Sequence, residues 1–448
     1  MTGSRRRRKP FTRGACGLLL LLSGLLGFQE SARASVACGY FAHASGCVLT
    51  AVQFPELRVR YRIPVFGCER VVLAGFLVPP EGGYAFVGLD HRLDFETSAG
   101  GAGDEAAPEA EEERLKAVVV DLRQGRVTRT LPFNARVWAY SPARKLLAAA
   151  EKSTIEVYDP VVQGTHARFE VPIAVQALQF SDDGSILYAT HWAFSLFPTL
   201  NPTALSVLDV DSSRTVGMLQ LVEDREPYTL IKPAGLARAY FGASSHYGPG
   251  ASQRGLLVVD LDALTIAGRL ELPGFLTAPV AAATTSDGRR MFIAHGPGDG
   301  RNMDIAIVAV PEDRVERIVP TGLDLIFPLA MSPGDDWLVA VASGSSPGRR
   351  VLALWNPDFL GEPTMKELAH LGTGPQLVAG SCPELKPCFA DCNADGSVSI
   401  DEIVHAVNVA LGTMNPLRCL AADQTGDGAV TVDELVRAVG DLLSGCDG

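Results

Sequence analysis

A short phrase recurs about every 50 residues through the middle of the chain, and it constrains the fold more than any other feature. Each copy is an apolar run that ends at or near an Asp or Asn, followed by a turn and a second alternating run. The copies end at Asp121, Asp159, Asp209, Asp260, Ala309 and Asn356, in steps of 38, 50, 51, 49 and 47 residues. Several strand-like runs per unit, repeated at such a period, are typical of the four-stranded blades of a β-propeller.

A second phrase lies upstream of the first in each unit and predicts tight turns. Its clearest copies are residues 180–191 (FSDDGSILYATH) and residues 285–295 (TSDGRRMFIAH). Glycine supplies the positive φ that such turns need, and aspartate can accept hydrogen bonds from its own backbone. Long helical periodicity is absent from this region, so we do not expect a helical repeat array.

The number of units predicts the number of blades. Six full units span residues 66–132, 134–171, 172–221, 222–273, 274–322 and 323–374. Strand-like runs in residues 36–65 could pair with residues 375–381 and form a seventh blade, which would close the ring and remove exposed sheet edges. We therefore predict a mainly β, seven-bladed propeller over residues 35–381, with a six-bladed ring as the alternative.

The stretch SDDGSILYATH…ALSVLDVDSSRTVGML, between residues 181 and 219, resembles the YVTN-type β-propeller repeat of exported bacterial proteins. Residues 187–191 (LYATH) stand at the YVTN position, and the likeness covers about 300 residues. This resemblance implies a propeller fold. It does not imply one activity, because propellers host many unrelated functions.

The N-terminus has the three parts of a secretory signal peptide. A basic cluster at residues 5–9 precedes an apolar run at residues 17–27, and a small-x-small cleavage site follows at residues 32–34. The apolar run is too short to span a bilayer, and no later stretch approaches 18 consecutive apolar residues. We therefore expect cleavage after about Ala34 and a soluble product that is secreted, periplasmic or on the cell surface.

The charge balance excludes polyanionic partners. The chain carries a net charge of −12, and removal of residues 1–34 leaves 32 basic and 50 acidic side chains, or −18. Such a protein would repel the phosphates of nucleic acids and anionic lipids. Residues 98–114 contribute to this excess, and their Gly/Ala/Glu composition without periodicity predicts a disordered surface insertion.

Eight cysteines follow the predicted cleavage site. They are Cys38, Cys47, Cys68, Cys382, Cys388, Cys392, Cys419 and Cys446. An even count behind a signal peptide predicts disulfides rather than a zinc site. Closure of the ring would bring Cys382 close to the first three cysteines, so we predict a disulfide from that group to Cys382.

Two twelve-residue segments near the C-terminus have the pattern of calcium-binding EF-hand loops. They are residues 391–402 (DCNADGSVSIDE) and 423–434 (DQTGDGAVTVDE), and alignment of 391–413 with 423–445 gives ten identities. Alternating oxygen donors, a glycine at position six and a closing glutamate match what Ca²⁺ requires. We predict two Ca²⁺ sites, the first formed by Asp391, Asn393, Asp395, Ser397, Ser399 and Glu402, and the second by Asp423, Thr425, Asp427, Ala429, Thr431 and Glu434.

The two sites should differ in strength, since Thr425 is a weaker third ligand than Asn or Asp. Extracellular calcium modules commonly bind with a Kd of about 10⁻⁴–10⁻³ M, which suits a permanently filled structural site. Each loop precedes an amphipathic helix, whereas two prolines between residues 382 and 388 make a helix before the first loop unexpected.

This duplicated loop–helix arrangement resembles dockerin-type modules of exported bacterial proteins. In that family, loop positions ten and eleven, often Ser-Thr, contact a cohesin partner. Here these positions are Ile400-Asp401 and Val432-Asp433, so the resemblance implies the fold and calcium ligation over residues 382–448 but leaves cohesin doubtful as a partner. Cys388 could pair with Cys446 and Cys392 with Cys419, although four cysteines allow three connectivities.

A weaker constellation lies in the propeller. His91, His191, His246 and His295 each follow the second apolar run of a unit, at intervals of 100, 55 and 49 residues. This spacing places them in equivalent loops, where converging histidines could bind a transition metal or act as general acid and base. The alternative is that each histidine is only a turn residue in the repeat phrase.

Three functional hypotheses follow. The first is a non-enzymatic binding or interaction protein with a calcium-ordered tail and an unknown protein or carbohydrate partner. The second is a propeller enzyme, lactonase-like or metal-dependent, with a His-lined face; no Ser/His/Asp signature, phosphate loop or HExxH motif is present. The third, implied by the dockerin resemblance alone, is a role in extracellular polysaccharide degradation.

Overall fold

The structure is a computed structural model. It describes residues 37–446 except for residues 44–45, 66–70, 92–115, 192–201, 224–225, 245–254, 273–280, 297–301, 325, 327, 344–349, 359–360, 368–375, 382–387, 394–396, 416–417 and 426. The predicted signal peptide, the acidic insertion at residues 98–114 and Cys382 therefore lie outside the described residues. Residues Val36–Gly448 form one compact unit.

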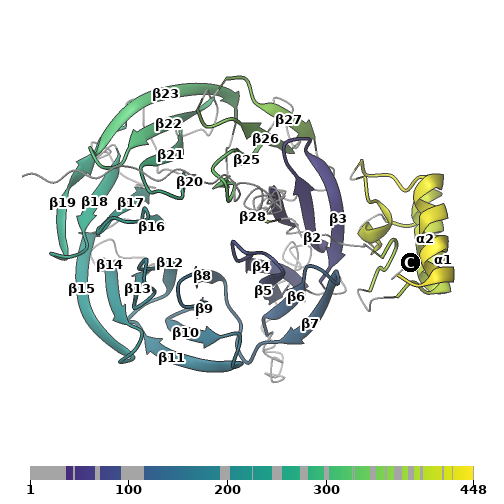
Figure 1. The fold of residues 1–448 in the computed structure, drawn as a ribbon, viewed down its shortest axis with the longest axis horizontal. Coiled ribbons are helices and arrows are strands. Elements are labelled where there is room, and N and C mark those ends of the chain that lie inside the picture. Colours follow the sequence, from purple (N-terminus) through teal and green to yellow (C-terminus); the bar gives the residue numbers. More distant parts are fainter. Residues whose placement is uncertain are drawn as a thin grey trace, which may run out of the picture. The chain divides into compact units, whose positions relative to one another are not determined.

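The described strands form seven four-stranded antiparallel sheets that follow one another around a ring (Figure 1). Six sheets are built from consecutive strands. They comprise β4 (Val71–Leu77), β5 (Tyr84–His91), β6 (Val118–Asp121) and β7 (Arg126–Thr130); β8 (Val137–Ser141), β9 (Leu146–Glu151), β10 (Thr154–Asp159) and β11 (Gly164–Glu170); β12 (Val175–Phe180), β13 (Ile186–His191), β14 (Pro202–Asp209) and β15 (Arg214–Glu223); β16 (Glu226–Ile231), β17 (Arg238–Ser244), β18 (Leu256–Asp260) and β19 (Thr265–Leu270); β20 (Ala281–Thr284), β21 (Arg290–His295), β22 (Met303–Ala309) and β23 (Arg314–Leu323); and β24 (Leu329–Met331), β25 (Leu338–Ser343), β26 (Arg350–Trp355) and β27 (Thr364–Glu367).

The seventh sheet joins the two ends of the propeller sequence. Its strand order is β28 (Gln376–Ser381), β1 (Ala37–His43), β2 (Gly46–Gln53) and β3 (Arg58–Pro64). Within it, β28 pairs antiparallel with β1, so that Cys38 lies opposite Gly380. The predicted seven-bladed fold is confirmed, and the six-bladed alternative is wrong. Cys38 is disulfide-bonded, but the predicted link to Cys382 falls outside the described residues.

The position of a strand within its blade explains its residue pattern. The middle strands of a blade are covered on both faces by neighbouring blades, so they are mostly apolar; all four residues of β6, the third strand of its blade, are buried. The outermost strand of the same blade, β7, alternates between exposed and half-buried residues. This contrast is expected where sheets stack face to face and one edge remains in solvent.

The turns between the first two strands of the blades have the predicted chemistry. Asp183 accepts a hydrogen bond from the Ser185 N–H at 3.0 Å and another from the Ser181 hydroxyl at 2.7 Å, and these bonds lower the pKa of Asp183 to about 2. Gly288 has a φ of 68°, and a Cβ there would lie 2.0 Å from the carbonyl oxygen of Ala234 in the preceding blade. Glycine is therefore required both by its backbone conformation and by the neighbouring blade.

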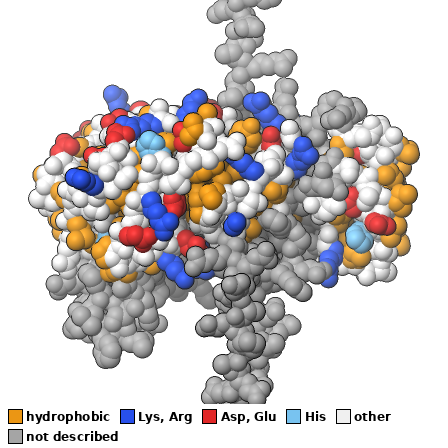
Figure 2. Space-filling model, turned by 90° about the horizontal axis from the view of Figure 1, so that it is seen from below, with side chains coloured by type: hydrophobic (Ala, Val, Ile, Leu, Met, Phe, Trp, Pro, Cys, Tyr) orange, Lys and Arg blue, Asp and Glu red, His pale blue; other side chains and the backbone are white. Residues whose placement is uncertain are grey.

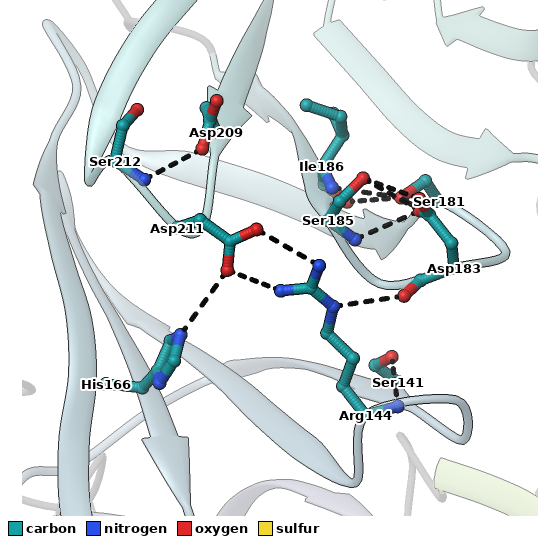
Figure 3. Close-up of polar contacts among 10 residues, drawn as sticks. All are labelled: Ser141, Arg144, His166, Ser181, Asp183, Ser185, Ile186, Asp209, Asp211 and Ser212. Carbon is teal, nitrogen blue, oxygen red and sulfur yellow. Dashed lines mark hydrogen bonds and ion pairs between the residues drawn. The ribbon is translucent and has the colours of Figure 1, made fainter.

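These turns also join successive blades, as Figure 3 shows for one interface. Arg144, between β8 and β9, donates to both carboxylate oxygens of Asp211 in the next blade, at 2.6 and 3.1 Å. Its Nε donates to the carbonyl oxygen of Asp183 at 3.1 Å. One guanidinium group thus holds two turns of the adjacent blade.

Ion pairs of the same kind occur at the next three interfaces. They are Lys232–Asp182 at 2.8 Å, Arg238–Asp313 at 2.6 Å and Arg290–Asp358 at 2.8 Å. The Lys232 side chain is only 4% exposed, whereas the others retain more contact with solvent. We therefore expect Lys232–Asp182 to matter most for stability.

The C-terminal part of the compact unit is helical. It contains the short 3₁₀ helix η4 (Leu420–Ala422) and the helices α1 (Ile400–Ala410) and α2 (Val432–Ser444). Within the described parts of the chain, no helix combines the length and apolar character needed to cross a membrane.

Asp182→Ala should lower the free energy of unfolding by about 1–3 kcal/mol, because the Lys232 ammonium group would stay buried without its carboxylate. Urea unfolding followed by fluorescence measures this loss. Asp211→Ala is the matched control, since its partner Arg144 can turn to solvent. Equal losses in the two variants would contradict the importance of burial of the Lys232 ammonium group.

Candidate functional site

The two C-terminal loops end in the same local structure. Ser399 caps α1 and Thr431 caps α2, and each hydroxyl accepts a hydrogen bond from the backbone N–H three residues later. That later residue is Glu402 or Glu434, whose carboxylate accepts in return from the N–H of the capping residue. This capping box follows from the S/T-x-x-E spacing of the sequence. The closing glutamate of each loop is therefore fixed by the first turn of its helix.

The same glutamates also hold the beginning of their loops. Oε1 of Glu402 accepts hydrogen bonds from the N–H groups of Cys392 and Asn393, at 2.8 and 3.1 Å. Oε1 of Glu434 accepts from Gln424 and Thr425, at 2.9 and 3.0 Å. Both carboxylates are 4% exposed. The last residue of each loop is thus joined to the second and third residues in the same way in both loops.

The second loop is the more completely described of the two. Asp423 is 1% exposed, and its Oδ2 accepts from the Gly428 N–H at 2.9 Å. Its Oδ1 lies 3.4 Å from the Thr425 hydroxyl, and Asp427 accepts from the Ala429 N–H at 2.9 Å. Gly428 has the positive φ of 87° expected at the sixth position. These oxygen donors are of the type that Ca²⁺ prefers.

Calcium binding itself stays a prediction. Among the residues with described positions, no group of three or more His, Cys, Asp or Glu side chains could hold a metal ion. Asp395, a predicted ligand of the first loop, lies outside the described residues. The two loops therefore offer an oxygen-rich framework whose occupancy needs an experiment.

Two disulfides fix the helical unit. They join Cys388 to Cys446 and Cys392 to Cys419, which is the pairing that the sequence allowed among three connectivities. Around them lies a small core that includes Ala406, Val409 and Ala438. A core of this size contributes little stability, so the disulfides are expected to contribute much of it.

Besides its buried face, each helix carries a row of apolar side chains that faces solvent. The exposed residues are Ile400, Val404, Val407 and Leu411 on α1, and Val432, Val436, Val439 and Leu443 on α2. Their spacing of four, three and four residues places each set on one helix face. Figure 2 shows hydrophobic side chains at the surface of this unit. We call these eight residues the apolar stripes; an offset of 32 residues relates one set to the other.

Arg62 connects the propeller to the second loop. It lies on β3, the last strand of the ring-closing sheet, and its Nη1 donates to Oδ2 of Asp423 at 3.0 Å. Both side chains are 1% exposed. Burial lowers the pKa of Arg62, whereas Asp423, Glu434 and Asp427 each act to raise it. Because arginine stays protonated in proteins, a full positive charge faces this loop.

The sequence did not reveal this contact. Arg58, Arg60 and Arg62 alternate along β3, and the first two are exposed. Arg62 belongs to the same alternating set, yet it is 4% exposed. Only the packing of a segment 361 residues away distinguishes it from its neighbours. No local pattern could have found it.

Three of the four propeller histidines occupy equivalent places, but at the end of a strand and not in the loop that their spacing predicted. His91, His191 and His295 each end the second strand of a blade, namely β5, β13 and β21. His191 is buried, and its Nε2 lies 2.9 Å from the Ser206 hydroxyl of the adjacent strand. His295 is equally buried. His246 and the side chain of His91 are outside the described part of the chain, so a catalytic role for these four residues stays a prediction.

A cavity of about 520 Å³ lies between the blades β4–β7 and β8–β11. Its lining includes Tyr84, Tyr140 and Arg129, and the Tyr140 hydroxyl donates to the carboxylate of Glu81. Tyr84 begins β5 and His91 ends it, so roughly 23 Å of extended chain separates the two at about 3.3 Å per residue. The described residues that line the cavity include no histidine.

Comparisons with known proteins support the fold alone. No protein-family model matches the chain, and no curated protein matches it. Hydrazine synthase of Kuenenia stuttgartiensis is similar in structure, with a TM-score of 0.50 and 15% identity over 70% of this chain and 90% of that chain. The β-propeller domain of Cps50 (Swd1) from Myceliophteria thermophila has a TM-score of 0.47 and 14% identity, over 66% and 85% of the two chains. At such identities the first likeness shows the propeller fold and no activity.

Acid should destabilise the protein through His191 and His295. Burial lowers the pKa of both imidazoles in the folded state, so protons bind first to the unfolded chain. The stability from the neutral rings is complete above the unfolded pKa of about 6.5 and is lost as the pH falls toward the folded-state pKa.

Melting temperatures measured between about pH 7.5 and about pH 5 test this dependence. The His191→Gln/His295→Gln double variant should lose less melting temperature on acidification than the wild type. His405→Gln, at an exposed position of α1, is the control and should follow the wild type. An unchanged pH dependence in the double variant would show that the two buried histidines are not responsible.

Proposed function

We propose that this protein is an exported, non-enzymatic interaction scaffold whose C-terminal unit binds a protein partner through the apolar stripes. The propeller fold supports a scaffold role, because its rigid ring presents surfaces without requiring chemistry. The disulfides of the C-terminal unit are compatible with an oxidising compartment outside the cytoplasm.

The apolar stripes carry this proposal. Each helix buries one face, which includes Ala406 on α1 and Ala438 on α2. The opposite face exposes 70% of Ile400 and 80% of Leu443. Exposed apolar side chains that form continuous stripes mark interaction surfaces more often than scattered ones do. Repetition of the same four positions in both helices argues that the surface is used.

The chemistry of the stripes indicates the class of partner. Apolar side chains that lie on a helix face suit a protein groove, and they offer little to a carbohydrate. Asp401 and Asp433 lie exposed beside the first residue of each stripe, so the partner surface should be apolar with basic residues at its edge. The dockerin resemblance supports a protein partner at this place. Cohesin is not proposed, because Ile400-Asp401 and Val432-Asp433 differ from the usual Ser-Thr contacts.

Calcium is the second part of the proposal. When bound, Ca²⁺ would supply positive charge to each loop, held by Asp391, Glu402 and the other predicted donors of the first loop and by Asp423, Glu434 and theirs in the second. Glu402 and Glu434 already connect the two ends of their loops through hydrogen bonds. The buried carboxylates at these positions support binding of a hard cation, which would stabilise the unit.

Val404→Asp and Val436→Asp should each weaken partner binding by at least about tenfold, because a charge would be placed on an apolar contact. A photo-crosslinker at position 404 or 436 of the full chain identifies the partner in the secreted proteins of the source organism. Binding of the purified partner to each variant is then measured by calorimetry.

A crosslinker at position 405, which is exposed but lies outside the apolar stripes, is the control and should capture less of the partner. The exposed valines should tolerate substitution with unfolding free energies within about 0.5 kcal/mol of wild type, so a loss of binding would not reflect misfolding. Crosslinks only to a second copy of the chain would contradict the proposal, as would equal binding by all variants.

Calcium should bind the full chain with a Kd of about 10⁻⁴–10⁻³ M. Glu402→Gln should weaken the first site and Glu434→Gln the second, each by about 10- to 100-fold or more, because a charged ligand is lost. Glutamine can still complete a capping box, so both helices should remain. Calorimetry reports affinity, and circular dichroism checks the helices. Absence of any calcium-dependent heat or gain in melting temperature would refute calcium binding.

A further inference from the structure

We propose that Arg62 docks the C-terminal unit against the propeller and, by doing so, opposes calcium binding in the second loop. This inference rests on the proposed calcium function and deepens it. It names a residue far from both loops in sequence as a second reason, beside Thr425, for the second calcium site to be the weaker one.

The docking contact is a buried ion pair. The Nη1 of Arg62 lies 3.0 Å from Oδ2 of Asp423, and both side chains are 1% exposed. β3 also contacts η4, the 3₁₀ helix that immediately precedes Asp423. A buried ion pair loses much of its hydration, so removal of one partner leaves an uncompensated charge. The contact should therefore resist opening while both partners are present.

Arg62 faces the carboxylates that calcium would use. Its positive charge interacts with Asp423, Glu434 and Asp427, which are positions one, twelve and five of the second loop. Lys366, on β27 of the neighbouring blade, also interacts with Asp427. Two cations on the outer strands of adjacent blades thus interact electrostatically with one acidic loop.

Calcium and Arg62 would interact with the same carboxylates. Oδ2 of Asp423 already accepts from both Arg62 and the Gly428 N–H, at 3.0 and 2.9 Å. A divalent ion in the loop would be close to the guanidinium group, and two like charges in a buried site repel strongly. By linkage, docking must lower calcium affinity at this loop by the same factor by which calcium weakens docking. The second loop is therefore both a docking element and the weaker calcium site.

Calcium titration calorimetry of the full chain tests the coupling. Arg62→Gln should tighten the second binding event by about 5- to 150-fold and leave the first unchanged. Addition of Glu434→Gln to Arg62→Gln should abolish the tightened event, which assigns it to the second loop. Arg60→Gln, on the same strand and exposed, removes the same charge and should behave as wild type. Unchanged or weakened affinity in Arg62→Gln overturns the coupling.

Hydrogen exchange in the absence of calcium tests the docking separately. Arg62→Gln should increase exchange in residues 58–64 and 420–425, whereas Arg60→Gln should not. Unchanged protection overturns the docking role. If Arg62→Gln does not fold, Arg62→Lys keeps the charge with fewer donors and should show a smaller effect in the same direction; wild-type behaviour of that variant in both experiments overturns the proposal.

Failure of the calcium function is distinguishable from failure of this inference. If no variant, including wild type, binds calcium, the proposed calcium function and the coupling both fall, and the exchange experiment still shows whether Arg62 holds the two parts together. If wild type binds calcium but Arg62→Gln matches it, only the coupling falls.

Discussion

The pairing of β28 with β1 is the contact on which the rest of the structure depends. A ring of sheets has no exposed inner or terminal edge only when its last blade is completed, and here strands from both ends of the propeller sequence complete it. This closure places β3 on the outside of the seventh sheet. It also sends the chain onward from Ser381, the last residue of β28, so that the C-terminal unit follows directly from the closing strand.

Within the ring, apolar contacts and ion pairs both stabilise the packing of neighbouring blades. Apolar strands such as β6 and β9 are buried between blades and contribute the non-directional part of the stability. Ion pairs such as Lys232–Asp182, in which the lysine is buried, add directional contacts between one blade and the next. The glycines at 184 and 288 let those turns approach the preceding blade, because any Cβ would clash with it.

The C-terminal unit depends less on apolar burial than the propeller does. Its apolar core is small, and much of its order comes from two disulfides and from glutamates that cap a helix and close a loop at once. Because the core is small, valines such as Val404 and Val436 are not needed in it and face solvent. A unit built in this way can present an apolar surface without losing its fold, and Arg62 connects that unit to a rigid support.

The sequence by itself determined the propeller fold and the order of its repeating units, because strand alternation and turn residues such as Gly288 are local properties that repeat with the blade. The choice between seven blades and six was decided by the pairing of β28 with β1. The sequence also indicated both loop–helix units, since capping and loop closure by Glu402 and Glu434 act within twelve residues. Only the tertiary structure decided which cysteines pair, that Val404 and Val436 face solvent, and that Arg62 rather than Arg60 is buried. Each of these features depends on contacts between residues that are far apart in sequence. The alternation of polar and apolar residues along one strand or helix does not indicate which other segment will cover it.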